Sequence, residues 1–98
     1  MKKDVLDHVA ICTDDIKKSV EWYTKNFKCD ILYQDSSWAM LEFDNVKLAL
    51  VLPEQHPFHF AILKDNVEDY GQPVTHRDGS VSVYIKDRSG NNIEILRY

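Results

Sequence analysis

Polar and apolar residues alternate at the start of the chain and then change to a longer period. In residues 4–12, His8 and Ala10 fall on one side and their apolar neighbours on the other, which is the period of two typical of a β-strand. Apolar residues then recur at spacings of four, three and four: Ile16, Val20, Tyr23 and Phe27. This helical period predicts an amphipathic α-helix directly after the strand.

Three more extended segments follow the predicted helix, at residues 30–34, 38–43 and 46–52. The short sequences DSS and DN between them are typical of turns. The chain then reaches PEQHP at residues 53–57, which we interpret as an internal linker. The residues before this linker therefore predict one βαβββ module.

After the linker the pattern begins again. HFAILKD, starting at His59, repeats the order of HVAICTD, starting at His8. Three further extended runs follow, at residues 74–76, 81–85 and 93–96. The residues between Leu63 and Gly71 leave room for only a turn or two of helix, against about four turns in the first half.

This internal repeat predicts a single α+β domain over residues 1–98. Its first βαβββ module covers residues 1–52, residues 53–57 form the linker, and the second module covers residues 58–98 with a shortened helix. We expect the two modules to form a curved mixed sheet around a cup-shaped site.

Strand parity sorts the side chains of this sheet onto two faces. One face is purely apolar and suits packing under helices: Ala39, Leu41, Phe43, Val46, Leu48, Leu50, Val81, Val83 and Ile85. The other face carries the candidates for chemistry: His8, Trp38, Glu42, His59, Tyr84 and Glu94. In the final segment, GNNIEIL, a solvated outer face would equally explain the single acid between two isoleucines.

Two histidines and one glutamate on a common face are the donor set of a metal site. Neutral imidazole and carboxylate suit Zn²⁺, Mn²⁺, Fe²⁺, Ni²⁺ or Co²⁺, and three ligands leave coordination positions open for water or substrate. His8, His59 and Glu94 are therefore candidate ligands. The alternative is that the two histidines correspond only through the repeat and face solvent.

Charge and composition exclude several classes of function. The formal net charge of −4, without a basic cluster, argues against nucleic-acid binding. The apolar runs are far shorter than the roughly 20 residues that span a bilayer, and the opening MKKDVLDHVAI does not resemble a secretory signal. Cys12 and Cys29 form no CxxC motif, so we expect free thiols and a cytoplasmic location.

Three segments resemble the vicinal-oxygen-chelate superfamily, which includes glyoxalase I, fosfomycin-resistance proteins, extradiol dioxygenases, methylmalonyl-CoA epimerase and bleomycin-resistance proteins. DHVAICTDDIKKSVEWYTKNF is similar to its opening strand and helix, HFAI to the start of its second half, and VYIKDRSGNNIEIL to its closing strands. The resemblance implies a divalent metal held by His8, His59 and Glu94.

The chain departs from that family in three respects. The sequence NFKCD stands where a glycine usually joins the helix to the second strand. Ala49 occupies the position at which glyoxalase I and the epimerase have a fourth ligand, so the resemblance shifts toward members with three ligands. The shortened second helix means that the pocket walls of any named member need not transfer.

Two functions follow from the resemblance. The first is a small metalloenzyme, a lyase, isomerase, transferase or dioxygenase, that chelates an oxygen-rich small molecule. Glu42 is its candidate general base and Tyr84 its candidate hydrogen-bond donor, although a solvated strand end and an amphipathic rim explain these two residues equally well. The second is a metal-free binding protein similar to the bleomycin-resistance proteins. A structural or regulatory role is a third possibility.

The remaining candidate residues are expected to serve packing or to lie at the surface. Trp38 and Met40 are expected to give the cup an apolar, substrate-contacting wall, or simply to pack. We expect His56 and His76 at the surface and Cys12 in the core. The short second helix predicts an uncovered apolar face, and hence a homodimer. That face comprises Phe58, Phe60, Ile62, Val81, Val83, Ile85, Ile93 and Ile95. The alternative is that the long first helix folds back and covers both sheets.

Overall fold

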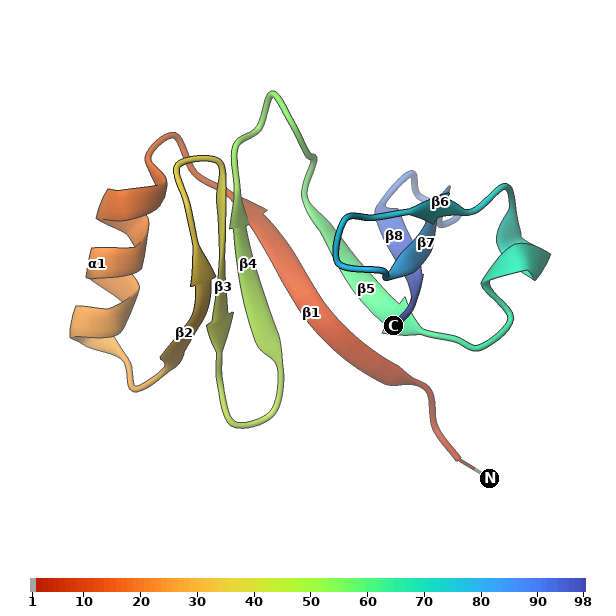
Figure 1. Ribbon diagram of the computed structural model, residues 1–98, viewed down its shortest axis with the longest axis horizontal. Helices are drawn as coiled ribbons and strands as arrows, with labels where there is room; N and C mark the ends of the chain where they lie inside the picture. The colour runs from red at the N-terminus through yellow and green to blue at the C-terminus, as the bar shows by residue number, and fades with distance from the viewer. Residues whose placement is uncertain (1) are drawn as a thin grey trace. The chain divides into compact units, whose positions relative to one another are not determined.

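The computed structural model describes residues 2–98, and its elements follow the predicted order (Figure 1). The strands are β1 (Val5–Cys12), β2 (Asp30–Gln34), β3 (Trp38–Glu42), β4 (Lys47–Val51), β5 (His59–Leu63), β6 (Val74–Thr75), β7 (Val81–Lys86) and β8 (Asn92–Arg97). The helices are α1 (Ile16–Asn26) and the 3₁₀ helix η1 (Val67–Tyr70). No helix within residues 2–98 combines the length and the apolar character needed to cross a membrane.

The chain divides into two compact units. The first unit is His8–Phe58, and the second consists of residues 2–7 together with His59–Tyr98. The strand order is β2-β3-β4-β1 in the first unit and β1-β5-β8-β7-β6 in the second, with β1 contributing to both. Each unit contains one parallel pair, β1 with β4 and β5 with β8, beside antiparallel neighbours. This confirms the α+β class and the two βαβββ modules, while the single-domain organisation stays a prediction.

Helix α1 begins where its sequence provides a capping side chain. Asp15 has an extended backbone, and its Oδ1 accepts a hydrogen bond of 3.0 Å from the backbone N–H of Lys18. This satisfies one of the amide groups that the first turn of a helix leaves without a partner. The helix ends at Asn26, where the N–H of Phe27 donates to the carbonyl of Tyr23 at 2.9 Å.

The first unit has an apolar cluster on each face of its strands. On the α1 side, Ile16 and Val20 of the helix pack against buried residues of β3 and β4: Ala39, Leu41 and Leu50. On the other side lie Ala10, Ala49 and Val51, with Cys12, Trp38 and Met40 packed against them. The apolar face predicted from strand parity is confirmed here, and Cys12 is partly buried in the second cluster, with its thiol 3.5 Å from the carbonyl oxygen of His56.

The second unit covers its apolar face with a single 3₁₀ turn. Val67 of η1 is fully buried against Val83 and Ile95, and residues Val81, Ile85 and Ile93 pack around them. The short segment therefore covers more of this face than the sequence led us to expect. The reason is that one branched side chain is placed over the middle of the strand pair, where several neighbours contact it. Phe58 stays 64% exposed.

Arg97 ties η1 to β8. Its guanidinium group donates to both carboxylate oxygens of Glu68, at 2.8 and 2.7 Å, and to the carbonyl of Asp65 at 2.8 Å. These hydrogen bonds from Arg97 lower the pKa of the Glu68 carboxyl group to about 2. A paired fork of this kind is the most specific ion-pair geometry that a carboxylate makes.

This contact predicts a pH-dependent part of the stability. A folded-state pKa below the ordinary value of 4.5 means that the stabilising effect is present above pH 4.5 and is lost as the pH falls toward 2. At neutral pH we expect Glu68→Gln to melt at a lower temperature than the wild type. The difference should shrink below pH 4.5 and vanish near pH 2 when melting is followed by circular dichroism. A difference that is independent of pH would contradict the assignment.

Candidate metal centre

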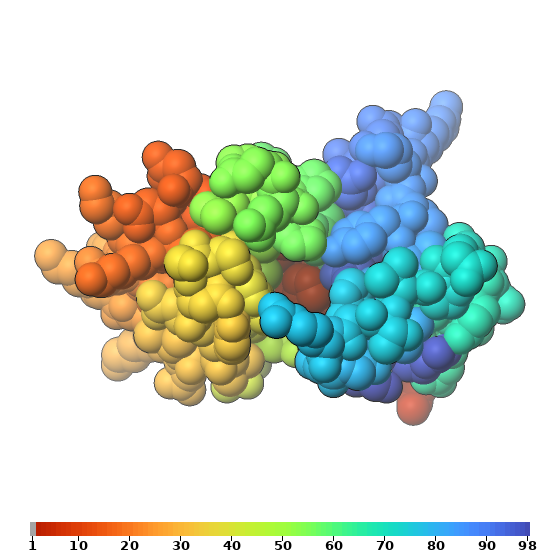
Figure 2. Space-filling view, turned by 45° about the horizontal axis from the view of Figure 1, so that its top comes forward, coloured from red at the N-terminus to blue at the C-terminus, as the bar shows by residue number. Residues whose placement is uncertain are grey.

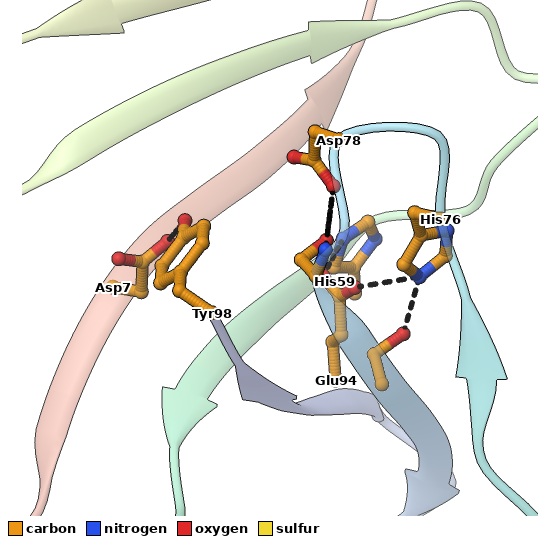
Figure 3. Close-up of polar contacts among 8 residues, drawn as sticks. Asp7, His59, His76, Asp78, Glu94 and Tyr98 are labelled. Carbon is orange, nitrogen blue, oxygen red and sulfur yellow. Dashed lines mark hydrogen bonds and ion pairs between the residues drawn. The ribbon is translucent and has the colours of Figure 1, made fainter.

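A buried histidine and a buried glutamate face each other in the second unit. His59 lies at the start of β5, and Glu94 lies in the middle of the neighbouring parallel strand β8, two residues beyond Asn92, the register partner of His59. The His59 Nε2 atom is 3.4 Å from Glu94 Oε1, and the two residues are only 7% and 6% exposed (Figure 3). The predicted convergence of these two residues is therefore observed.

Their separation suits two ligands of one cation. Zinc–nitrogen and zinc–oxygen bonds are roughly 2.1 Å long, so two donor atoms at adjacent corners of a tetrahedron lie about 3.4 Å apart. The distance from His59 Nε2 to Glu94 Oε1 has this value. It is longer than the roughly 2.7–2.9 Å of a hydrogen bond between a protonated imidazole and a carboxylate. The donor set and its spacing thus fit a divalent metal.

Tyr84 borders this pair. It is the cross-strand neighbour of Glu94 on β7, and its ring meets the His59 ring edge-on with the centroids 5.3 Å apart. Burial of the phenol, together with the charge of Glu94 and a hydrogen bond to it, raises the pKa of Tyr84 above its ordinary value. The phenol therefore keeps its proton throughout the neutral range. Its catalytic and substrate-binding roles stay predictions.

His76 was expected at the surface, and its side chain is in fact only partly exposed. Its Nε2 atom lies 2.7 Å from the hydroxyl of the buried Ser82 and 4.0 Å from Glu94 Oε2 (Figure 3). The hairpin turn that follows His76 directs it back toward the sheet, because Asp78 accepts hydrogen bonds from the N–H and the hydroxyl of Ser80. The alternation of side chains along a strand does not continue through such a turn, so the sequence did not predict that His76 approaches Ser82 and Glu94.

His8 is buried on β1 in the first unit, opposite Lys47 of β4. Lys47 in turn lies opposite Glu42 of β3, so Glu42 shares a row with His8 two strands away. With strands about 4.8 Å apart, their backbones are separated by roughly 10 Å. Glu42 is exposed at the end of its strand. Its role as a general base, like the joining of His8 to the pair in the second unit, stays a prediction.

Trp38 and Met40 lie on the same face of the first unit as His8. Met40 is opposite Ala49, and Trp38 is opposite Val51. The indole of Trp38 also stacks on the ring of Tyr33, with the centroids 4.5 Å apart. Both side chains are half-buried in an apolar cluster, so packing explains their apolar character. Their predicted contact with a substrate stays a prediction.

Solved structures with the same fold share little sequence with this chain. A hypothetical protein from Bacillus halodurans is 20% identical, with 99% of this chain and 96% of that chain covered and a TM-score of 0.76. A glyoxalase/bleomycin resistance protein/dioxygenase superfamily member from Vibrio splendidus is 10% identical, with 98% and 100% covered and a TM-score of 0.74. A lactoylglutathione lyase from Agrobacterium tumefaciens is 18% identical, with 98% and 95% covered and a TM-score of 0.51.

At these identities the structural likeness establishes the fold and leaves the activity open. No curated protein matches the sequence. The family-level comparison is more specific, because the profile of one superfamily matches residues 5–95, which is nearly the whole chain. The chain belongs to the glyoxalase/bleomycin resistance protein/dioxygenase superfamily.

Proposed function

We propose that this protein binds a divalent metal ion through His8, His59 and Glu94 and uses it to act on an oxygen-rich small molecule. The observation that carries the proposal is the buried pair of His59 and Glu94 in the second unit, at a ligand-like separation of 3.4 Å. His8 occupies the equivalent place at the start of the first repeat, and it is also buried. Members of the superfamily often bind divalent metals.

The burial of His59 and Glu94 supports metal binding, because a buried carboxylate needs a partner that compensates its charge. Taking a carboxylate out of water is costly unless it is paired with a proton, a cation or a metal. The neutral phenol of Tyr84 is hydrogen-bonded to Glu94 but brings no positive charge. A bound cation would compensate the carboxylate and use both donor atoms at once.

In the expected chemistry, the metal would stabilise negative charge, and side chains of the protein would bind the ligand and transfer protons. A bound metal would act as a Lewis acid toward vicinal oxygens of the ligand, stabilising negative charge as it develops. Tyr84 keeps its proton in the hydrogen bond to Glu94, and we propose that this proton would turn to a ligand oxygen when Glu94 is engaged by a metal. Glu42 is our candidate base, and Trp38 and Met40 our candidate apolar wall. Ala49 offers no ligand atom, so three protein ligands would leave positions open for the substrate.

The reaction class that fits is a lyase, isomerase, transferase or dioxygenase step on such a ligand. A metal-free binding protein is the second candidate. The stacked rings of Tyr33 and Trp38 favour it, because a flat aromatic pair on a half-exposed face can receive an aromatic ligand. We further propose a cytoplasmic protein, since Cys12 and Cys29 are both free thiols.

Metal titration separates the two candidates. We expect the purified, chelator-stripped protein to bind one equivalent of Zn²⁺ or Co²⁺ in isothermal titration calorimetry. His8→Ala should weaken the binding by roughly tenfold or more, because it removes a ligand. His56→Ala is the matched control, since His56 is an exposed histidine of the linker and its loss should change nothing.

Two results would count against the proposal in different ways. Unchanged affinity and stoichiometry in His8→Ala would remove His8 from the ligand set. A wild-type protein that binds no metal, but that binds aromatic small molecules, would favour the metal-free alternative.

A further inference from the structure

His76 has no role in the function proposed above, but its side chain reaches buried residues of the second unit. It directly follows β6, and its backbone N–H donates to the carbonyl of Ser80 at 2.8 Å. The hairpin that carries it lies at the outer surface of the unit (Figure 2, light blue). The imidazole is 39% exposed, and its Nε2 atom faces two buried side chains, Ser82 and Glu94 (Figure 3). His76 therefore connects the surface to the candidate metal centre.

Hydrogen bonds within the turn fix the place from which His76 enters the unit. Asp78 Oδ1 accepts from the N–H of Ser80 at 2.9 Å and from its hydroxyl at 2.6 Å. The N–H of Gly79 donates to the carbonyl of His76 at 3.0 Å. Gly79 has a φ of +88°, which glycine adopts without steric cost. The backbone at His76 is therefore well defined by the turn that follows it.

The Nε2 atom of His76 borders a hydroxyl and a carboxylate oxygen. Ser82 Oγ is 2.7 Å away, which is a hydrogen-bond distance, and Ser82 is only 1% exposed. Glu94 Oε2 is 4.0 Å away, which is the separation of a loose ion pair and too long for a direct hydrogen bond. The hydrogen bond with Ser82 thus sets the direction of the ring, and the ring in turn borders Glu94.

The two carboxylate oxygens of Glu94 have different neighbours. Oε1 is 3.4 Å from His59 Nε2, a distance that suits two ligands of one cation. Oε2 is 4.0 Å from His76 Nε2. A carboxylate can bind a metal through one oxygen or through both, and binding through both uses an additional coordination position. A polar group beside the second oxygen favours binding through the first oxygen alone.

We propose that His76 is a positioning residue, which keeps Glu94 Oε2 turned away from His59 so that only Oε1 binds a divalent metal. Ser82 supports this role through its hydrogen bond with the imidazole. The inference rests on the proposed metal site and adds residues outside its ligand set, which commonly orient the ligands and raise the affinity for the metal. His76 would also stay beside Oε2 when Tyr84 turns its proton toward a ligand.

The alternative is a structural role, in which the imidazole only satisfies the buried hydroxyl of Ser82. A change at His76 would then act on folding, because a buried hydroxyl without a partner costs free energy. A positioning role acts on the metal-loaded state instead. Metal binding and folding stability, measured on the same variants, therefore separate the two roles.

The first measurement is the affinity of the full chain for Zn²⁺ or Co²⁺, by competition with a chromophoric chelator. We expect His76→Ala to weaken binding by about tenfold, as the loss of a group that orients a ligand commonly does. His76→Gln should retain most of the affinity, because its side-chain amide also offers an N–H donor. His56→Ala is the matched control, an exposed histidine of the linker, and should bind as the wild type does.

The second measurement is the visible absorption spectrum of the Co²⁺-loaded protein, which reports the coordination geometry of the ion. His76→Ala should change the spectrum, because Oε2 could then join Oε1 at the metal, whereas His76→Gln should resemble the wild type. Ser82→Ala should act in the same direction as His76→Ala. The double variant should cost no more affinity than His76→Ala alone, since the two residues are proposed to act as one unit.

Circular dichroism melts of the metal-free variants report the structural role. Melting of His76→Ala close to the wild type, together with weaker metal binding, supports positioning. An unchanged affinity and spectrum in His76→Ala would overturn it, and so would equal losses in His76→Ala and His76→Gln or a loss that only follows unfolding. These results leave the metal site standing. A wild type that binds no metal would instead overturn the proposed function, and the role of His76 with it.

Discussion

Replacing Glu94 by glutamine is expected to reduce the affinity for Zn²⁺ or Co²⁺ by roughly a hundredfold or more. The carboxylate is the one negatively charged group in the proposed ligand set, and glutamine of the same shape is a neutral, weaker donor. Because Glu94 is buried and close to His59, little solvent or rearrangement is available to replace the lost charge. Competition with a chromophoric chelator, at a pH near 7.5, would measure the change.

A second glutamate provides the control for this experiment. Glu42 is exposed, and the first unit holds it two strands away from His8, so Glu42→Gln should keep the wild-type affinity even if catalysis is lost. The metal-free Glu94→Gln protein should also stay folded, because glutamine fills the same volume beside Tyr84. Equal affinities of Glu94→Gln and the wild type would show that the buried pair does not bind the metal.

Strand parity was a reliable guide where a segment is regular and its neighbours are regular too. The period of two correctly separated Leu41 from Met40 on β3, and the helical period correctly identified Ile16 and Val20 as the buried side of α1. Each of these assignments depends only on local geometry, since alternate residues of a strand face opposite ways.

The pair of His59 and Glu94 required more than parity. Parity placed each residue on a face, and the repeat marked His59, but only the parallel register of β5 against β8 brings their side chains together. The resemblance to the superfamily implied that the two residues are ligands of one metal, without giving that register. His76 could not be found in this way, because its approach to Glu94 depends on the geometry of a hairpin turn.

Local sequence patterns also did not predict that Val67 covers the apolar face of the second unit. Val67 belongs to a four-residue 3₁₀ helix, which is too short for a periodic signal. Its burial comes from tertiary contacts with β7 and β8. The sequence therefore predicted a bare apolar face, whereas Val67 covers the middle of that face in the structure. The homodimer stays a prediction.

The largest effect on stability is expected at Leu41. This side chain is 0% exposed on β3, enclosed by α1 and by Leu48 of β4, which lies opposite it. Leu41→Ala should lower the free energy of unfolding by about 2–5 kcal/mol, the sum of the lost apolar transfer and of the cavity that remains. In a chain of this size such a loss is a large part of the total stability. Urea denaturation followed by fluorescence and circular dichroism would measure it.

Leu6→Ala is the control, because it removes the same atoms from a leucine in a more exposed environment. Leu6 of β1 is 50% exposed, and Leu6→Ala should cost less than about 1 kcal/mol, because half of its surface already faces water. If the two substitutions cost the same, the packing of α1 on β3 and β4 would not be the main source of stability in the first unit. A loss at Leu41 several times that at Leu6 would instead identify the packing of α1 on β3 and β4 as a main source of stability in the first unit.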